Sequence, residues 1–335
     1  ARVLHVPFGY FFLSSPPIER PALPDLRTVA DESRDSFSPD FLDLLNDVLR
    51  KQQWYREFLI AESAELLPFI GRFQIDHNEN QIAEDIRQTL EINEAFRDQV
   101  QSWEGFLTKF IERLENFRIL VLRSGIVKND THRILSVDEF RGFVINDDIA
   151  PLIFLNGQDS RAAQIFTLAH ELAHLWIGAS GISNPDIGSP HLSQNQPIEK
   201  FCNRVAAEVL VPEASFLVEW QPDQQIHENV ARLASRYRVS KLVILRRAFD
   251  LQKLTWPQYI ENYQSAKERY DALQKGQESG GGNFYATLAT RNSRQLIKAA
   301  VSAAFEGRLS YRDAGRLLGV KVEKLGRVAA KFGIR

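Results

Sequence analysis

The feature that most constrains this chain is the run QIFTLAHELAHLWIGASG at residues 164–181. Apolar residues dominate it, but two histidines stand four positions apart, with a glutamate directly after the first. Positions i and i+4 of an α-helix lie on one face, so His170 and His174 can each present an imidazole nitrogen to one metal ion. Glu171 can then reach a water molecule held by that ion. We therefore expect a helix with a metal site, bordered by a hydrophobic core.

A catalytic zinc site needs a third protein ligand. The chain has one cysteine, Cys202, so a cluster of thiolates is excluded and the ligand should be His, Asp or Glu. Glu199, at the start of the next expected helix, is our first choice; Glu208 and His191 are the alternatives. Glu208 lies nearly opposite Glu199 on a helix, so it is expected to face solvent or a salt bridge when Glu199 and Asn203 face the metal.

The pattern of apolar residues predicts an α+β fold that is mostly helical. Residues 39–117 follow a helical period. The segments RILVLRSG, FRGFVIND and APLIFLNG are short and rich in β-branched or aromatic residues, which predicts a small antiparallel or mixed three-stranded sheet packed on the HExxH helix. The strand LIFLNG is either plain sheet core or an edge to which an extended substrate adds.

The chain divides into four segments by composition and pattern. We expect an extended and helical region at 1–117, a domain that contains the metal site and the helix-turn-helix-like helices after it at 118–274, a flexible linker at 275–283 and a basic helical C-terminal module at 284–335 that folds separately. Residues 283–335 carry eleven Lys/Arg against three Asp/Glu, which suits an anionic partner such as nucleic acid or a solvated surface.

Two segments have the outline of a helix-turn-helix. The segment ENVARLASRYRVSKLVILRRAFDL, around a turn at residues 238–240, is either a DNA-binding pair or a helical pair packed on the core, and its apolar residues favour packing. The second, SYRDAGRLLGVKVEKLGRVAAKFG in the basic module, turns at Gly319. DNA is therefore a candidate partner.

The two motifs together, TLAHELAHLWIG and IEKFCNRVAAEVLVP, resemble the ImmA/IrrE family of zinc metallo-endopeptidases. The resemblance implies a gluzincin-like fold, zinc bound by His170, His174 and Glu199, Glu171 as the catalytic residue, and cleavage of an Xre-type repressor encoded nearby. The opening VPFGYFFLSSPP is similar to longer members, where it follows an Xre-type helix-turn-helix that this sequence lacks. The sequence also contains no methionine, and we expect it to be a piece of a longer protein.

The resulting hypothesis is a cytoplasmic zinc endopeptidase that regulates transcription, with Glu171 as general base and no membrane partner. Four residues are open as a second donor to the oxyanion: His132, His191, Tyr237 and Arg141. The alternative function is a DNA-binding regulator or toxin–antitoxin component whose zinc site serves as a sensing or partner-binding scaffold.

Overall fold

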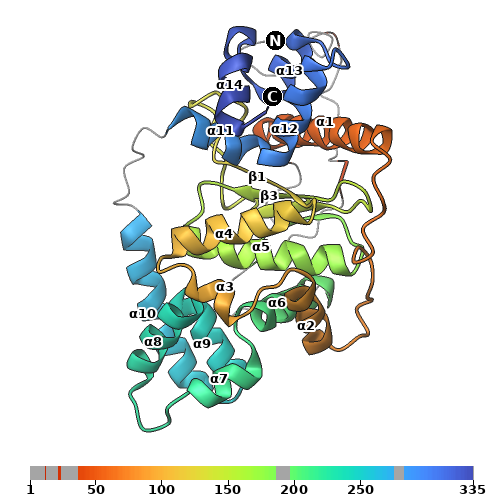
Figure 1. Cartoon of the computed structure of the whole chain (residues 1–335). Helices are drawn as coiled ribbons and strands as arrows, with labels where there is room; N and C mark the ends of the chain where they lie inside the picture. The colour runs from red at the N-terminus through yellow and green to blue at the C-terminus, as the bar shows by residue number, and fades with distance from the viewer. Residues whose placement is uncertain (1–11, 13–21, 24–36, 186–196, 275–282, 335) are drawn as a thin grey trace.

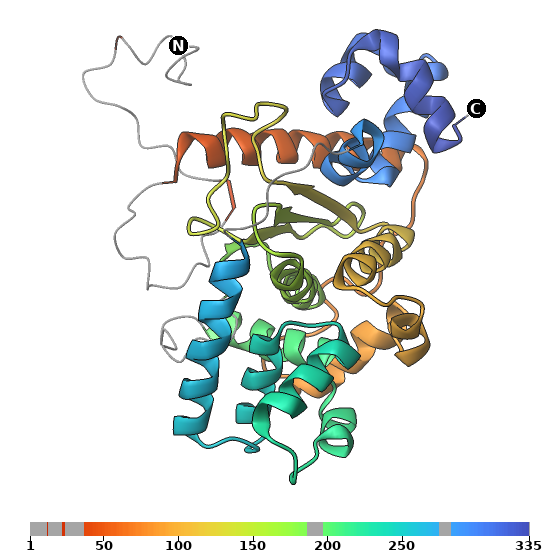
Figure 2. The same cartoon turned by 90° about the vertical axis from the view of Figure 1, so that its left-hand side faces the viewer.

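A computed structural model of the chain describes residues 12, 22–23, 37–185, 197–274 and 283–334. Three tiers are visible in Figure 1: the C-terminal helices and α1 above, the sheet with α4 and α5 in the middle, and α6 to α10 with α2 and α3 below. The turned view in Figure 2 shows the same order of tiers. Among the described helices, none combines the length and apolarity that a bilayer-crossing segment requires.

The helices occupy most of the described chain. Before the sheet come α1 (Pro39–Ala61), α2 (Glu79–Thr89), α3 (Glu94–Asp98) and α4 (Trp103–Asn116). In the chain, α5 (Arg161–Trp176) lies between the third and the fourth strand. After the fourth strand come α6 (Pro197–Leu210), α7 (Glu213–Glu219), α8 (Ile226–Tyr237), α9 (Lys241–Asp250) and α10 (Trp256–Gln274). The last group is α11 (Phe284–Asn292), α12 (Arg294–Phe305), α13 (Tyr311–Leu318), the short 3₁₀ helix η3 (Val322–Lys324) and α14 (Leu325–Phe332). The expected α+β class, mostly helical, is confirmed.

The sheet has four strands in the order β1-β3-β2-β4. Its members are β1 (Leu120–Ser124), β2 (Gly142–Ile145), β3 (Leu152–Asn156) and β4 (Gly181–Ser183). β1 runs parallel to β3, while β2 runs antiparallel to both β3 and β4. The sheet is therefore mixed, as one of the two expected alternatives, but it contains one strand more than the sequence pattern indicated.

The segment LIFLNG forms β3, which hydrogen-bonds to a strand on each side. Of the two alternatives for this segment, the structure therefore matches sheet core and excludes an edge. The sheet edges are β1 and β4. β4 is the strand that the sequence pattern did not indicate, because three residues are too few to show an alternation of apolar and polar side chains.

Each face of the sheet is covered by a different hydrophobic core. Ile153 and Leu155 of β3 point into one core together with α5 and α6, whereas Leu152 and Phe154 point into the other. This second core is completed by α1 and by the C-terminal helices α11 to α14. Since β3 is buried on both sides, it reads as a continuous apolar run rather than an alternating one.

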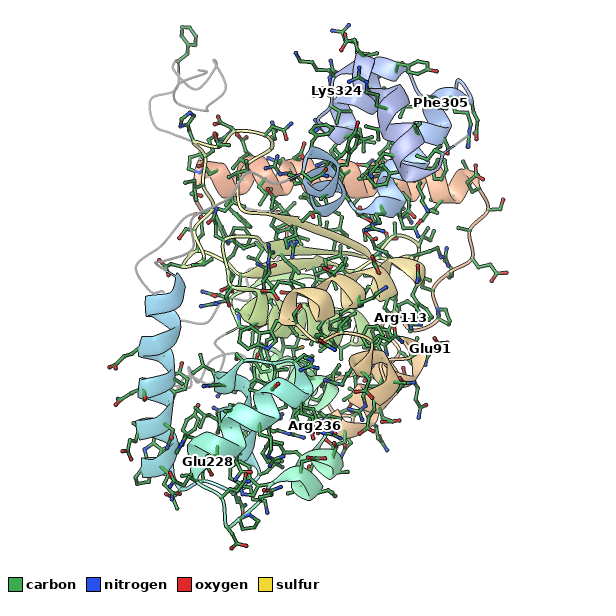
Figure 3. All side chains as sticks on the ribbon, turned by 60° about the vertical axis from the view of Figure 1, so that its left-hand side comes forward. Glu91, Arg113, Glu228, Arg236, Phe305 and Lys324 are labelled. Carbon is green, nitrogen blue, oxygen red and sulfur yellow. The ribbon has the colours of Figure 1, made fainter. Side chains whose placement is uncertain are left out.

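The C-terminal helices are fastened to the rest of the chain by polar contacts as well. The Glu115 carboxylate of α4 accepts a hydrogen bond from the backbone N–H of Arg294 at 3.0 Å, and the Asn129 side chain donates to the carbonyl of Gly319 at 2.9 Å. Phe305 and Lys324, labelled in Figure 3, belong to these C-terminal helices, which lie above the sheet in that view. The shared core gives no support to separate folding of the basic module. The predicted linker lies outside the described residues except for Asn283.

The helices α8 and α9 form the expected pair, with Arg238 between them in the left-handed conformation at φ 57°. Arg246 forms a salt bridge with Asp250 at 2.9 Å, and Arg247 forms one with the buried Glu208. Both arginines of α9, the second helix of the pair, are therefore paired within the protein, which matches the packing alternative. DNA binding by these helices stays a prediction.

Candidate metal centre

The helix α5 carries the HExxH motif, and its ends are well defined. Ser160 caps its first turn by accepting a hydrogen bond from the N–H of Ala163 at 3.2 Å. At the other end, the N–H groups of Gly71 and Phe73 donate to the carbonyls of Leu175 and Trp176 at 2.9 and 3.0 Å. These contacts satisfy carbonyl groups that a helix end leaves without partners, so the helix is held firmly at both termini.

The side chains of His170, His174 and Glu199 meet between α5 and α6. His170 Nε2 lies 3.2 Å from Glu199 Oε2, His174 Nε2 lies 3.0 Å from Glu199 Oε1, and the two Nε2 atoms are 3.1 Å apart. All three side chains are at most 2 % exposed. The part of the chain that the structure describes contains this one group of at least three residues able to hold a metal ion.

The spacing of these atoms fits a tetrahedral ion. Ligands about 2.0–2.1 Å from a tetrahedral centre are separated from one another by about 3.3–3.4 Å. The three observed separations are close to that value. In addition, Glu199 Oε1 and His174 Nδ1 are buried without a regular hydrogen bond. Buried polar atoms of this kind are costly without a partner, and a cation at the centre would remove the cost for the carboxylate oxygen.

Asn203 lies one turn after Glu199 on α6, and its side-chain oxygen is 3.0 Å from His170 Nδ1. An Nδ1–H that donates to this oxygen leaves Nε2 unprotonated, which is the form that binds a metal. α6 packs against α5 through residues of the same hydrophobic core, including Cys202 and Val205. One helix therefore supplies both the carboxylate and the amide that orients a histidine ring.

Glu171 points towards the sheet rather than along the helix face of the two histidines. Its Oε1 accepts a short hydrogen bond from the Ser183 hydroxyl of β4, while Oε2 has no partner within the described residues. Ser183 pairs with Gly142 across β2 and β4. A Cβ atom at Gly142 would lie 2.7 Å from Glu171 Oε1, so only glycine leaves room for the carboxylate. Sequence reasoning missed both neighbours because the pairing of β2 with β4 brings them together.

Burial and charge set the ionisation of the two carboxyl groups, Glu171 and Glu199. Burial raises the pKa of the Glu171 carboxyl to about 8, although His170 and the Ser183 hydrogen bond act against it. Burial also acts to raise the pKa of Glu199, but the charge of His170 and the contacts with both rings outweigh it and lower the pKa to about 2. Glu199 is therefore a ready anionic ligand, and Glu171 is a strong base when it is ionised.

The alternatives for the third ligand lie elsewhere. Glu208 is on the far side of α6, where it pairs with Arg247 and accepts hydrogen bonds from the N–H of Glu213 at 3.1 and 3.2 Å. This is the salt-bridge position expected for it. His191 lies outside the described residues. The geometry thus brings together the three residues chosen first, and their roles at a metal remain predictions.

The remaining candidates for an oxyanion donor have other partners or lie on the surface. The Tyr237 hydroxyl is 2.7 Å from that of Ser215. Arg141 donates to Asp159 at 2.7 Å and to Asn184 at 3.1 Å, and His132 is in an exposed loop. Arg141 is nearest in the fold to Glu171, since it precedes Gly142 and its N–H donates to the carbonyl of Ser183. None of the three is placed on the metal ligands.

Comparison with known proteins gives two family matches. Residues 115–249 match the IrrE N-terminal-like domain (Peptidase_M78), and residues 292–331 match a domain of unknown function (DUF8813). No curated protein matches the chain. The first match spans the whole sheet, α5 and α6, and so includes the HExxH helix and Glu199. The resemblance seen in the sequence is thereby confirmed over residues 115–249, which form an IrrE N-terminal-like domain.

Proposed function

We propose that the chain is a zinc-dependent endopeptidase that regulates transcription by limited cleavage of an Xre-type repressor. The observation that carries the peptidase part is the convergence of His170, His174 and Glu199 at separations suited to zinc, with Glu171 next in sequence to the first ligand. The match to a peptidase family supports the same chemistry. The repressor as substrate rests on the family resemblance.

Each residue of the site has a distinct task in this proposal. Zinc, when bound by the two histidines and Glu199, would supply Lewis acidity that makes a water molecule more acidic and polarises a peptide carbonyl. Glu171 removes the proton from the attacking water and delivers it to the leaving amine. Its Oε2 suits this transfer because it has no other described partner, and Ser183 holds the opposite oxygen.

The residues around the site favour both the binding of a metal ion and the proton transfer by Glu171. The side chains of His170, Glu171 and His174 are fully buried, so a charge on Glu171 acts through a medium of low polarity. Asn203 keeps His170 in one ring orientation, which saves the reorganisation that a free imidazole would need.

The test is Glu171→Gln, which keeps the size of the side chain but removes its basicity. We expect a folded protein with normal zinc content whose cleavage rate falls by about 10²–10⁴-fold. Glu228→Gln is the matched control, because Glu228 is an exposed residue of α8, as Figure 3 shows, and should keep full activity. Zinc is measured by elemental analysis and cleavage by mass spectrometry of the products.

Two substrates separate the parts of the proposal: the Xre-type repressor encoded nearby and an unfolded protein such as casein. Cleavage of casein alone would overturn the assignment of the repressor and leave the peptidase. Full activity of Glu171→Gln on either substrate would overturn the peptidase. The alternative, a sensing or partner-binding scaffold, requires no proton transfer at Glu171, so its biological activity should survive this substitution.

A further inference from the structure

A cavity of about 410 Å³ lies on the sheet face away from the metal centre, between α1, the end of β1, the loop at 126–129 and the helices α11 and α13. We call it the basic cavity. In Figures 1 and 2, α1 and the C-terminal helices that form its walls are adjacent in both views. Its volume is within the range of about 300–1,000 Å³ that is usual for small-molecule sites. The residues that line it come from segments up to 275 positions apart, between Leu44 and Gly319.

The charges in the cavity are strongly unbalanced. Its lining contains one carboxylate, Asp47, and five cationic side chains: Arg50, Lys51, Lys128, Arg291 and Arg316. Asp47 is already engaged by two of them, since Lys51 Nζ lies 2.9 Å from it and Arg50 also pairs with it. Burial lowers the pKa of Lys51, and Arg50 and Arg291 lower it further because like charges are close. One buried carboxylate therefore faces an excess of positive charge.

Three of the cations have no close carboxylate partner among the described residues. Lys128 forms no hydrogen bond or ion pair there, and the nearest carboxylate oxygen to Arg316 is that of Asp313 at 3.8 Å. Arg291 donates to the neutral side chain of Asn129 at 2.8 Å, and its burial lowers its pKa. Cationic groups that converge on one cavity without counter-charges are arranged to meet an anion.

The floor of the cavity is apolar. Leu122 and Phe154 of the sheet and Leu318 of α13 are buried there. A ligand with charged groups at the mouth and a flat or apolar portion inside would use both parts. A nucleic-acid backbone would instead need a basic stripe along the surface, with charges spaced like its phosphates. The concave shape and converging charges favour a small molecule.

We propose that the basic cavity binds a small anion that carries phosphate groups, as a nucleotide or pyrophosphate does. Such a ligand would contact Lys51 of α1, Lys128 of the loop and Arg291 of α11 together. It would therefore join the C-terminal helices to the rest of the chain. Asn129 connects the loop to the C-terminal helices before any ligand binds, because its side chain accepts a hydrogen bond from Arg291 and donates one to the carbonyl of Gly319.

The experiment titrates the full chain with pyrophosphate and with ATP by calorimetry, and follows thermal unfolding in parallel. The protein is first dialysed against a chelator, so that metal at the triad cannot bind the phosphates. We expect saturable binding and a rise in the unfolding temperature. The variant Lys128→Gln/Arg316→Gln should bind at least about tenfold more weakly. Both residues are exposed, so the variant should fold normally.

The matched control is Lys109→Gln/Lys253→Gln, which removes the same charge from exposed positions outside the cavity. It should bind like the original chain. Tighter binding of ATP than of pyrophosphate would assign the apolar floor to the nucleoside, and equal binding would assign recognition to the phosphates alone. The proposal is overturned if neither anion binds or if both variants weaken binding equally.

Discussion

Gly142 of β2 faces the carboxylate of Glu171, and replacing it with alanine tests whether that carboxylate must occupy its observed place. A Cβ atom at this position would lie 2.7 Å from Glu171 Oε1, 2.7 Å from Thr167 Cγ2 and 3.1 Å from the backbone oxygen of Phe154. Ordinary contacts between such atoms are about 3.5–4.0 Å. One of the contacts is with backbone in the centre of the sheet, so the new methyl group cannot simply move away from the helix.

The magnitude follows from two opposing effects. Overpacking of a well-packed interior costs about 1–3 kcal/mol. The loss of backbone freedom in the unfolded chain returns about 0.4–1 kcal/mol. We therefore expect Gly142→Ala to lower the free energy of unfolding by up to about 2.6 kcal/mol. Because the displaced atoms belong to Glu171 and not to the three metal ligands, cleavage should fall sharply while zinc content stays unchanged.

Gly326→Ala is the matched control. Gly326 is the second residue of α14, and a Cβ atom there would meet nothing within 4 Å. Because the penalty for glycine in a helix interior is at most about 1 kcal/mol, this substitution should leave the stability unchanged or raise it by less than that. Urea unfolding, elemental analysis for zinc and the casein assay measure the three quantities. If Gly142→Ala were as stable and as active as Gly326→Ala, the tight fit of Glu171 against β2 would be refuted.

Three further predictions concern the metal ligands, the amide beside them and a buried phenol. Glu199→Ala should strip the metal, whereas Glu208→Ala should leave the metal content of the folded fraction unchanged; the reverse pattern in elemental analysis would reassign the third ligand. Asn203→Ala should weaken metal binding about 10–100-fold in competition with a chromogenic chelator, and unchanged affinity would show that its contact with His170 has no orienting effect. Burial raises the pKa of Tyr55 to about 12, so the folded chain keeps a proton that the unfolded chain loses above about pH 10. Stability should therefore fall as the pH rises from about 10 towards 12, by about 2 kcal/mol at pH 11.5, and Tyr55→Phe should remove this loss in urea unfolding; an identical pH dependence in the two proteins would contradict it.

Much of the metal centre was predictable because its geometry is local. The spacing of His170 and His174 fixes them on one face of a helix whatever surrounds it, and Ser160 marks where that helix begins. Helical geometry also placed Glu199 and Glu208 on different faces of α6, so only one of them could face the metal, and the family resemblance pointed to Glu199. The prediction of the site required in addition only that α5 and α6 pack together, and their apolar faces favour this packing.

The tertiary structure alone decided the surroundings of Glu171 and the role of the C-terminal helices. The order of strands depends on pairing between distant segments, so neither the interior place of β3 nor the contact of Ser183 with Glu171 could be read from local pattern. A glycine-rich linker suggested an appended module, yet the helices after it close the second face of the sheet and form a wall of the basic cavity. Local sequence specifies what each helix presents on its faces, whereas the choice of which faces meet is made by the burial of the whole chain.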